Sequence, residues 1–405
     1  MIPVEEALGR ILAAINVQPA EQVSLRNALG RVLAVDVTSR RTQPPAAMSA
    51  MDGYAVKADD VASVPAALRV VAEIPAGASY DTELRAGEAA RIFTGAPLPP
   101  GADTIVIQED TERDGATVTV KETARKGAFV RAAGLDFAEG ETLLKAGKVL
   151  NARDIGLAAA MNRPWLMVRR RPRIAILATG DEVVMPGDEL GPNQIVSSNS
   201  LALAAAVEVL GGEPVLLGIA ADDAESLKTL AAGARGADLL VTTGGASVGE
   251  HDLVQSVLGE DGLTVDFWKI AMRPGKPLIF GSMGNTLMLG LPGNPVSTLV
   301  CATIFMAPAI RAMLGRNAGL EDQEFTARCG VDLKRNDRRQ DYLRASLASG
   351  SDGTLTATPF EKQDSSMLRL LQQADCLVIR EPHAEPLAKG APVRCLRIPG
   401  SALSL

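Results

Sequence analysis

Hydrophobic and polar residues alternate in two different ways within residues 173–315. Short apolar runs typical of strands take turns with longer runs whose apolar positions fall on one helix face. This alternation predicts an α/β domain with a doubly wound, mostly parallel sheet. The predicted strands are residues 174–178, 214–219, 239–243 and 287–291. The predicted helices are residues 199–210, 223–233, 252–258 and 295–314, with Asp222 and Glu225 forming a capping box before the second.

The flanking segments follow other patterns. Two helical stretches are expected in residues 1–45 and another helix at 154–161, whereas residues 68–130 hold short alternating runs between Gly and Pro turns. Similar short runs after residue 319 predict a second small β domain. We therefore expect four parts: an elongated helical and extended N-terminal domain (1–45 plus 140–170), an inserted β domain (46–139), the α/β domain (171–316) and a C-terminal β-barrel-like domain (317–405).

Composition narrows the class of protein. Hydrophobic residues make up 47% of the 405 residues and charged residues 22%, as in folded globular proteins. The net charge of −7 and the 3% of aromatic residues argue against nucleic acid or anionic lipid as the main partner. Glu5 and Glu6 stand where a signal peptide would be basic. The uncharged stretch 277–310 is broken by Pro292 and Pro295, so we expect a cytoplasmic protein without a membrane span.

Cysteine and histidine usage limits the metal chemistry. The four cysteines form no C-x-x-C pair, and the chain has only two histidines. Thiolate and imidazole metal sites are therefore disfavoured, and four reduced, mostly buried thiols are expected. Any metal site has to be built from carboxylates.

Acidic residues follow three of the four predicted strands. Glu182, Asp222 and Asp252 lie in loops that meet at the carboxyl edge of a parallel sheet, where ligands bind. Carboxylates gathered there suit a hard cation such as Mg²⁺. Taken alone, each of Asp222, Asp223 and Asp252 is better explained as a helix cap. Their recurrence at the strand ends favours a metal site.

The same edge carries groups that bind anions. Lys269, Arg273 and Lys276 lie in the segment KIAMRPGKP, and glycine-rich turns follow two of the strands. Neither a P-loop nor a G-x-G-x-x-G motif is present, so a standard nucleotide site is not supported. A metal site beside an anion site indicates phosphate chemistry.

The string Gly245–Gly249 satisfies G-x-S-x-G and follows a strand, as the nucleophile of a hydrolase would. The acid–base partners do not fit, because His251 is only a turn away and His383 lies in the C-terminal β domain. We therefore interpret Ser247 as a loop residue that donates a hydrogen bond to an anion.

Several strings of the chain, taken together and in their order, resemble the molybdopterin molybdenumtransferase family, called MoeA in bacteria and the E domain in gephyrin. These strings are SAMDGYAV, RIFTGAPLPPGAD, RDIGLAAA, ATGDEV, TTGGASVGEHD, KIAMRPGKP and LGLPGNPVS. The resemblance covers nearly the whole chain. It implies a four-part subunit and a homodimer whose active sites are shared between chains. It also implies a reaction, the insertion of molybdate into adenylylated molybdopterin with Mg²⁺-dependent release of AMP.

The resemblance also assigns residues. Asp52, Thr94 and Asp136 would come from the partner chain, and Glu182, Asp222 and Asp252 would line the cleft from the α/β domain. The remaining assignments are Lys269, Arg273 and Lys276 as ligands of molybdate or the pterin phosphate, Pro292 and Pro295 as the turn beneath them, and Ser365 as a contribution of the C-terminal domain. The chain departs from the common family pattern at Ala47-Met48, Leu135, Arg273 and Gln363-Asp364-Ser365.

Two alternatives from other classes stay open. Relatives of this fold also serve as non-catalytic scaffolds of the gephyrin type, and another phosphoanhydride or ester could be the substrate of a hydrolase. Chemically competent acidic and basic groups at every position of the expected site favour the transferase. Molybdopterin adenylyltransferase and proteins that mature molybdoenzymes are candidate partners.

Overall fold

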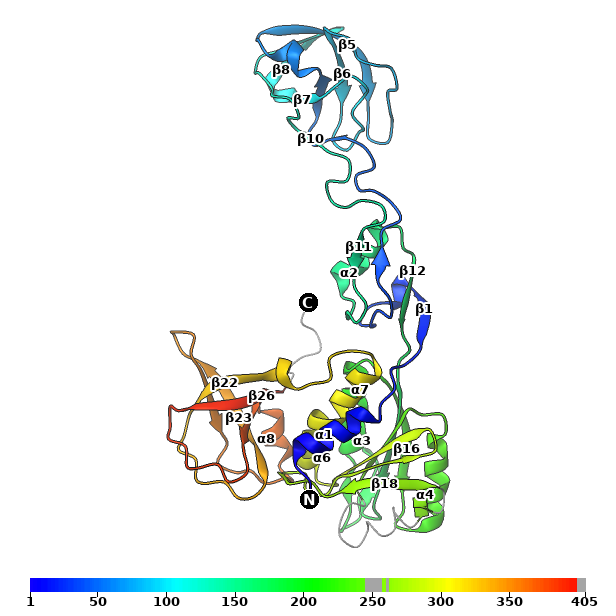
Figure 1. Ribbon diagram of the computed structural model, residues 1–405, viewed down its shortest axis with the longest axis vertical. Coiled ribbons are helices and arrows are strands. Elements are labelled where there is room, and N and C mark those ends of the chain that lie inside the picture. The colour runs from blue at the N-terminus through cyan, green and yellow to red at the C-terminus, as the bar shows by residue number, and fades with distance from the viewer. Residues whose placement is uncertain (245–256, 260–261, 399–405) are drawn as a thin grey trace.

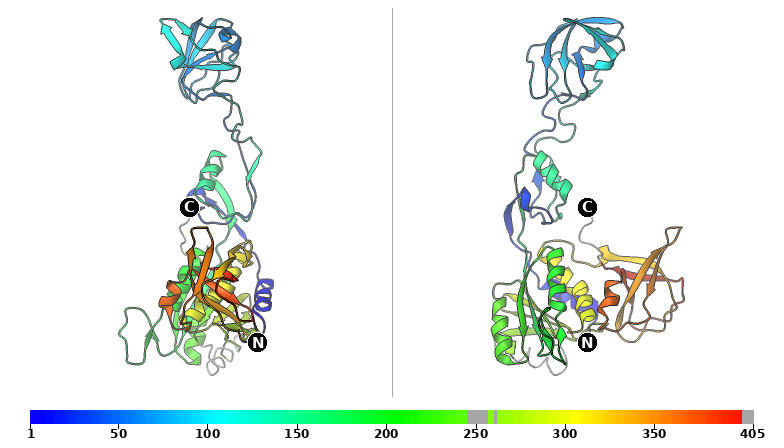
Figure 2. Two further views of the ribbon diagram at one scale, coloured as in Figure 1. Left: turned by 90° about the vertical axis from the view of Figure 1, so that its left-hand side faces the viewer. Right: turned by 180° about the vertical axis from the view of Figure 1, so that it is seen from behind.

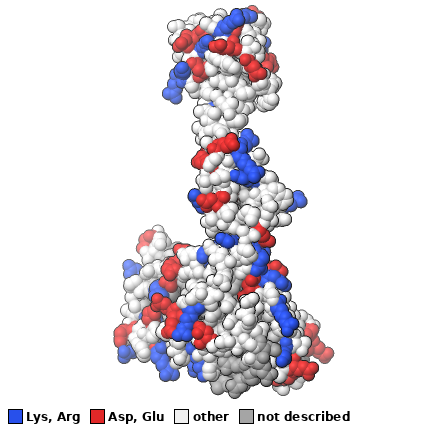
Figure 3. Space-filling model, turned by 45° about the vertical axis from the view of Figure 1, so that its right-hand side comes forward, with Lys and Arg blue, Asp and Glu red and all other residues white. Residues whose placement is uncertain are grey.

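The computed structural model describes residues 1–244, 257–259 and 262–398. The molecule is elongated: a small β domain lies at one end, and the α/β domain and a C-terminal barrel lie side by side at the other (Figures 1 and 2). A thin neck joins the two ends. Charged side chains of both signs are interspersed over both ends, whereas the segment just below the small β domain shows mostly uncharged surface (Figure 3).

The α/β domain is built on a six-stranded sheet of order β16-β13-β17-β21-β20-β18. Its strands are β13 (Arg173–Thr179), β16 (Glu213–Ala220), β17 (Leu239–Thr243), β18 (Leu263–Trp268), β20 (Ile279–Met283) and β21 (Thr286–Leu291). The first four in the order pair in parallel and the last two antiparallel. The predicted mostly parallel sheet is therefore confirmed, and the sequence pattern missed β18 and β20. A small pairing of β14 (Val183–Val184) with β15 (Ile195–Val196) lies outside this sheet.

Helices cover the sheet as the pattern requires. They are α3 (Asn199–Val209), α4 (Ala224–Ala231), α6 (Pro295–Cys301) and α7 (Ala307–Met313), with a π-helical turn, Ala302–Met306, joining the last two. Asn294 precedes Pro295 at the start of α6. The expected capping box of α4 is wrong: Asp223, one residue later, caps the helix by accepting from Ser226 N. The helix expected at 252–258 lies mostly outside the described residues.

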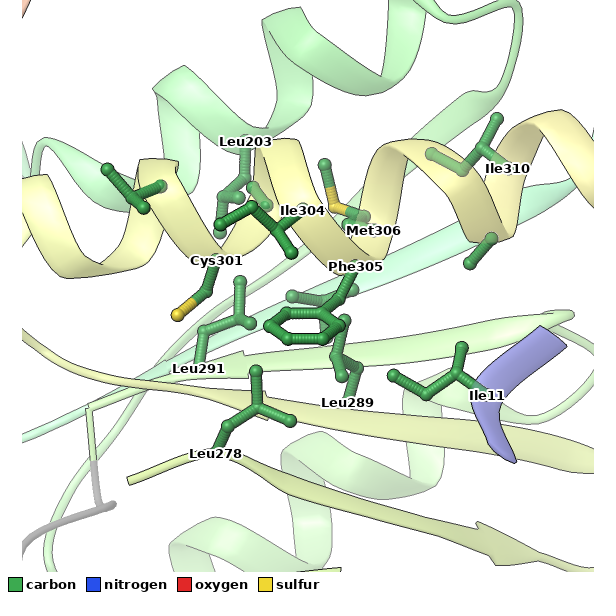
Figure 4. Close-up of a cluster of buried hydrophobic side chains, with 14 of the residues drawn as sticks. Ile11, Leu203, Leu278, Leu289, Leu291, Cys301, Ile304, Phe305, Met306 and Ile310 are labelled. Atoms are coloured by element: carbon green, nitrogen blue, oxygen red, sulfur yellow. The ribbon is translucent and has the colours of Figure 1, made fainter. Parts of the chain in front are cut away.

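The core of this domain lies between the long helix and the sheet. Ile304 and Phe305 are fully buried among Leu278, Leu289 and Leu291 (Figure 4). Among the described residues, the helix Pro295–Met313 is apolar and long enough to cross a membrane by length and composition, but 83% of its apolar window is buried inside the protein. It packs as the core helix that its proline-bounded start predicts.

The N-terminal segment contributes to two parts. Helix α1 (Val4–Ala13) buries Val4, Ala7 and Ile11 in the α/β core. The second helix expected in residues 1–45 is wrong, because Gln22 and Val23 form part of a strand that pairs along its whole length with β12. The neck is built from β1 (Ala20–Ser24), β2 (Val37–Thr38), β11 (Thr142–Leu144), β12 (Trp165–Arg169), a short 3-10 turn (Leu25–Asn27) and α2 (Ala152–Ala160). Asn151 and Asp154 form a capping box on α2.

The inserted β domain is a six-stranded sheet of order β7-β4-β6-β5-β9-β8. Its strands are β4 (Gly53–Val56), β5 (Ala66–Ile74), β6 (Glu88–Ile92), β7 (Thr104–Ile107), β8 (Thr111–Asp114) and β9 (Thr117–Val120), with the separate pair β3 (Met48–Ser49) and β10 (Val130–Arg131) at its base. Two antiparallel chain segments connect it to the neck. Few backbone hydrogen bonds hold them together, among them Gln43 N to Phe137 O at 2.8 Å.

The C-terminal domain is a closed barrel, as predicted. Its order is β19-β23-β24-β22-β26-β25, and pairing of β23 with β25 closes it. The elements are β19 (Met272–Arg273), β22 (Glu324–Cys329), β23 (Gln340–Ser349), β24 (Leu355–Pro359), α8 (Leu368–Gln372), β25 (Cys376–Arg380) and β26 (Pro392–Arg397). Strand β19 comes from the α/β domain, so the KIAMRPGKP segment is attached to the barrel. All four cysteines are buried and free, as expected.

Candidate active site

A cavity of about 330 Å³ opens at the carboxyl edge of the α/β sheet. The ends of β13 and β17 and the turn after β21 meet there with the first residues of α3 and α6. This is where ligands bind in open α/β sheets. The lining residues include Thr179, Glu182, Val183, Ile195, Val196, Asn199, Thr243, Gly244, Pro277, Pro292, Gly293 and Pro295.

Hydrogen bonds at the cavity floor fix the orientation of one amide. Asn199 Nδ2 donates to Gly293 O at 2.7 Å and to Thr243 Oγ1 at 2.9 Å, and Thr243 Oγ1 in turn donates to Pro292 O at 3.3 Å. Both amide hydrogens are thereby used, so Asn199 Oδ1 can only accept. That oxygen and Thr179 Oγ1 have no hydrogen-bond partner among the residues that the structure describes. Hydrogen-bonding capacity is therefore left over at the cavity floor.

Gly244 keeps the cavity open where β17 ends. Its φ of +92° lies in the region that favours glycine. A Cβ at this position would lie 2.4 Å from Thr179 O, a contact that backbone atoms cannot relieve cheaply. The glycine-rich turn noted in the sequence therefore has a steric reason at this residue.

The expected carboxylate cluster is only partly assembled among the described residues. Glu182 is exposed and lines the cavity. Asp222 lies apart from the lining: its N–H donates to Asp181 Oδ1 at 2.9 Å, and Asp181 N–H points back at Asp222 Oδ2 at 3.4 Å. Asp252 and Ser247 lie outside the described residues. Within the described ranges no group of three acidic, His or Cys side chains could hold a metal ion.

Of the three expected cations, Arg273 is already neutralised. It forms an ion pair with Asp337 at 3.2 Å and a second one with Asp341, whose side chain is 5% exposed. Both acids belong to the barrel domain, and their hydrogen bonds and charges raise the pKa of the Arg273 guanidinium. Arg273 thus joins the barrel to the loop, and its role in holding an anion stays a prediction.

The two lysines differ from it. Lys276 is exposed and forms no ion pair with any residue in the described part of the chain, which leaves its charge available. Lys269 has a φ of +74°, and its Nζ lies 3.4 Å from the centroid of the Trp268 ring. Lys269 N donates to Leu278 O at 3.2 Å, next to the lining residue Pro277.

The turn after β21 contacts the expected serine of the barrel domain. Asn294 Nδ2 donates to Ser365 Oγ at 2.8 Å, and Val296 N donates to Ser365 O at 3.1 Å. Pro292 and Pro295 both line the cavity, as their place in the turn suggested. The sequence around Ser365 departs from the common family pattern, but this residue of the barrel domain still contacts the turn.

Sequence reasoning missed Arg344. This side chain is 1% exposed and is held by Gln363 Oε1 and Met367 O, but its Nη2 has no partner in the described part of the chain. Burial lowers the pKa of the guanidinium. Buried guanidinium groups normally pair with a carboxylate, so the open Nη2 is unusual. The string QDYLRAS contains no signal for this, because the unusual feature is the surroundings of the residue.

At the other end of the molecule, Asp52 is held by one residue. Thr94 donates to Asp52 Oδ1 from its backbone N at 2.7 Å and from Oγ1 at 2.8 Å. These hydrogen bonds, with help from the charge of Arg91, lower the pKa of the Asp52 carboxyl, so it stays ionised. Arg91 is fixed between the rings of Tyr54 and Phe93, at 5.2 and 4.8 Å.

Asp136 lies where the inserted domain meets the neck. Its carboxylate is exposed, and its N–H donates to Gln43 O at 3.0 Å. Asp52 and Thr94 belong to the inserted β domain and Asp136 to a segment that joins it to the neck. The inserted domain lies at the opposite end of the molecule from the α/β domain that holds the cavity (Figures 1 and 2). One chain alone does not bring the two groups of predicted site residues together.

Three family models match almost the whole length of the chain. The MoeA N-terminal region (domain I and II) matches residues 2–162, a probable molybdopterin binding domain matches residues 175–312, and the MoeA C-terminal region (domain IV) matches residues 326–397. With the cavity at the sheet edge, these matches define the class as that of multidomain molybdopterin-binding proteins.

Individual relatives indicate the same family as the family models. A molybdopterin molybdenumtransferase of Nostoc sp. is 42% identical over 338 residues, covering 82% of this chain and 78% of the relative. That of Haemophilus influenzae is 32% identical and covers 97% and 98%. A crystal structure of a molybdopterin biosynthesis MoeA protein from Pyrococcus horikoshii is 34% identical, has a TM-score of 0.86 and covers 98% and 99%. The chain belongs to the MoeA family of molybdopterin molybdenumtransferases, which confirms the resemblance.

Proposed function

We propose that this transferase of molybdenum cofactor biosynthesis inserts molybdate into adenylylated molybdopterin and releases AMP in a Mg²⁺-dependent step. The observation that carries the proposal is the cavity at the sheet edge, which is lined by an exposed carboxylate and by polar groups without partners among the described residues. Lys269 and Lys276 belong to the segment that ends at the lining residue Pro277. Such a combination suits a substrate that carries both phosphate and polar ring groups. The reaction is expected in the cytoplasm.

The basic and the acidic residues near the cavity would have different roles. Lys276 and Lys269 would attract the oxyanion. Glu182, with Asp222 and Asp252, would hold Mg²⁺, since all three supply the hard oxygen ligands that this ion prefers. When bound, the ion would supply charge that stabilises phosphate oxygens. Asp181 fixes the loop that carries Asp222.

The second half of the site would come from another copy of the chain. Asp52 is ionised and rigid but distant from the cavity of its own chain, which supports a homodimer with shared sites. Apolar side chains on α3 also face outward: Leu201 is 45% exposed and Val209 60%. Val209 borders a groove of about 580 Å³. An exposed apolar face of this kind suits a subunit contact.

The decisive experiment gives purified protein adenylylated molybdopterin, Mg²⁺ and molybdate, and follows AMP release together with cofactor formation. Glu182→Gln should reduce both by about 100-fold, because the cavity loses its charged oxygen ligand. Glu189→Gln is the matched control, an exposed glutamate that does not line the cavity.

Three results would contradict the proposal. AMP release without cofactor formation would indicate a hydrolase, and tight binding without turnover would indicate a scaffold. Equal activity of the Glu182→Gln and Glu189→Gln proteins would remove Glu182 from the site.

A further inference from the structure

The backbone of Lys269 has an unusual conformation. Its φ of +74° is one that side-chain-bearing residues seldom adopt outside functional or turn positions. Hydrogen bonds hold it there from both sides: Lys269 N donates to Leu278 O at 3.2 Å, and Ile2 N donates to Lys269 O at 3.3 Å. A glycine would fit this backbone without strain, so the lysine side chain is the feature that needs explaining.

The consequence of this conformation is contact with the preceding residue. In extended backbone, neighbouring side chains point to opposite faces. The left-handed φ of Lys269 breaks that alternation directly after β18, and the ammonium Nζ lies 3.4 Å from the centroid of the Trp268 ring. An ammonium over a tryptophan face is attracted by the negative charge of the ring's π system.

An aromatic face holds a cation differently from a carboxylate. Arg273, four residues further on, is paired with Asp337 and Asp341, so its charge is neutralised. Lys269 forms no ion pair with any residue in the ranges that the structure describes. The Trp268 ring fixes the ammonium but carries no net charge, so the N–H donors stay available to an anion.

Trp268 and Lys269 also lie at the end of the sheet where the cavity opens. Trp268 pairs with Ile279 across β18 and β20, and Ile279 pairs with Gly290 of β21. This register puts Trp268 at the sheet edge that holds the cavity, beside the loop in which Pro277 lines it.

We infer that Trp268 is a positioning residue, which fixes the Lys269 ammonium toward a tetrahedral oxyanion at this edge without neutralising it. The inference rests on the proposed function, because it gives Lys269 an anion to bind. It adds the residue that sets how well Lys269 does so.

The chain offers a direct readout, because it has only two tryptophans. Trp165 is 57% exposed on β12 in the neck, so Trp165→Phe leaves Trp268 as the only reporter and should not alter activity. Titration of this protein with molybdate, and separately with inorganic phosphate and AMP, should change Trp268 emission to saturation. The same background carrying Lys269→Met should show no change.

Substitution of Trp268 then tests positioning. Trp268→Leu should raise the Kd for molybdate, measured by calorimetry, and the KM by about 2- to 30-fold, the range of a cation–π contact, with little change in kcat. Trp268→Phe keeps an aromatic face and should recover most of the affinity. Phe267→Leu is the matched control, because it removes a buried aromatic of the same strand that packs on Phe280. It should lower the melting temperature and leave Kd unchanged.

Wild-type affinity in Trp268→Leu, with affinity lost in Lys269→Met, would overturn the inference and leave the proposed function standing. So would the absence of any Trp268 response to all three probes. A saturable response in a protein that releases no AMP would refute the proposed function and leave the positioning role intact.

Discussion

The inserted β domain and the α/β domain present their polar groups in opposite states. In the inserted domain, Asp52 receives two hydrogen bonds from Thr94 and is locked as an ionised carboxylate. At the α/β edge, Asn199 Oδ1 and Thr179 Oγ1 have no protein partner, and Lys276 has no ion-pair partner in the described residues. A carboxylate that hydrogen bonds hold in its ionised form is already in the state in which it would act. Polar groups without protein partners suit a site in which a bound ligand supplies the missing hydrogen bonds.

The largest expected effect tests whether the inserted β domain and the α/β domain of one active site come from different subunits. A dimer of Asp52→Ala chains and a dimer of Glu182→Ala chains should each lose about 100-fold in turnover. A heterodimer of the two should regain about half of the wild-type rate, because one of its two sites then contains neither substitution. Differently tagged chains, purified as heterodimers, allow the measurement. Activity no higher than in the parent variants would show that both regions act within one chain.

An intermediate effect separates the cations within the α/β half. Arg273→Met should destabilise the protein by about 1–3 kcal/mol, because Asp341 loses its partner while largely buried. The half-exposed arginine keeps the figure at the low end of that range, and burial already raises the pKa of Asp341, so protonation can relieve part of it. Arg273→Lys should restore part of the stability.

Lys276→Met is the matched comparison on the same loop. It should change the free energy of unfolding by less than about 0.5 kcal/mol and weaken molybdate binding instead. Thermal unfolding and calorimetry on both variants give the contrast. Weakened molybdate binding in Arg273→Met at unchanged stability would instead assign Arg273 to the anion site.

The smallest effect tests the locked carboxylate. The hydrogen bonds from Thr94 lower the pKa of Asp52, so the carboxylate stays charged as the pH falls and protonates only below its ordinary range. Thr94→Val keeps the backbone donor and removes the hydroxyl, which should raise that pKa and make kcat/KM fall at a higher pH on acidification. Thr94→Ser should keep the wild-type profile. Identical acid limbs in all three proteins would exclude the hydroxyl as a determinant.

Local patterns predicted the parallel half of the sheet, because its strands are short apolar runs between turns. They missed β18 although LTVDFW alternates polar and apolar residues over six positions, as a half-buried strand does. The second N-terminal helix was wrong because pairing of Gln22 and Val23 with β12, some 145 residues away, overrode local preference.

Sequence reasoning could name Glu182 from its residue type and its place after a strand, and the structure puts it in the cavity lining. The ion pairs of Arg273 and the open Nη2 of Arg344 could not be predicted, because both depend on the surrounding residues. Asp341 reaches Arg273 through the pairing of β19 with β23, and the open Nη2 of Arg344 is a property of a buried strand. Neither relation exists until distant segments are packed together.

The two segments that carry the inserted domain act as a lever arm. A small change of angle where Gln43 and Phe137 exchange backbone hydrogen bonds becomes a larger displacement of the inserted domain, which carries Asp52. The accuracy with which that carboxylate reaches another molecule is therefore governed by the bending stiffness of a few peptide groups. A more flexible neck would let the inserted domain take up a wider range of positions. Turnover would then fall although every reacting group is intact.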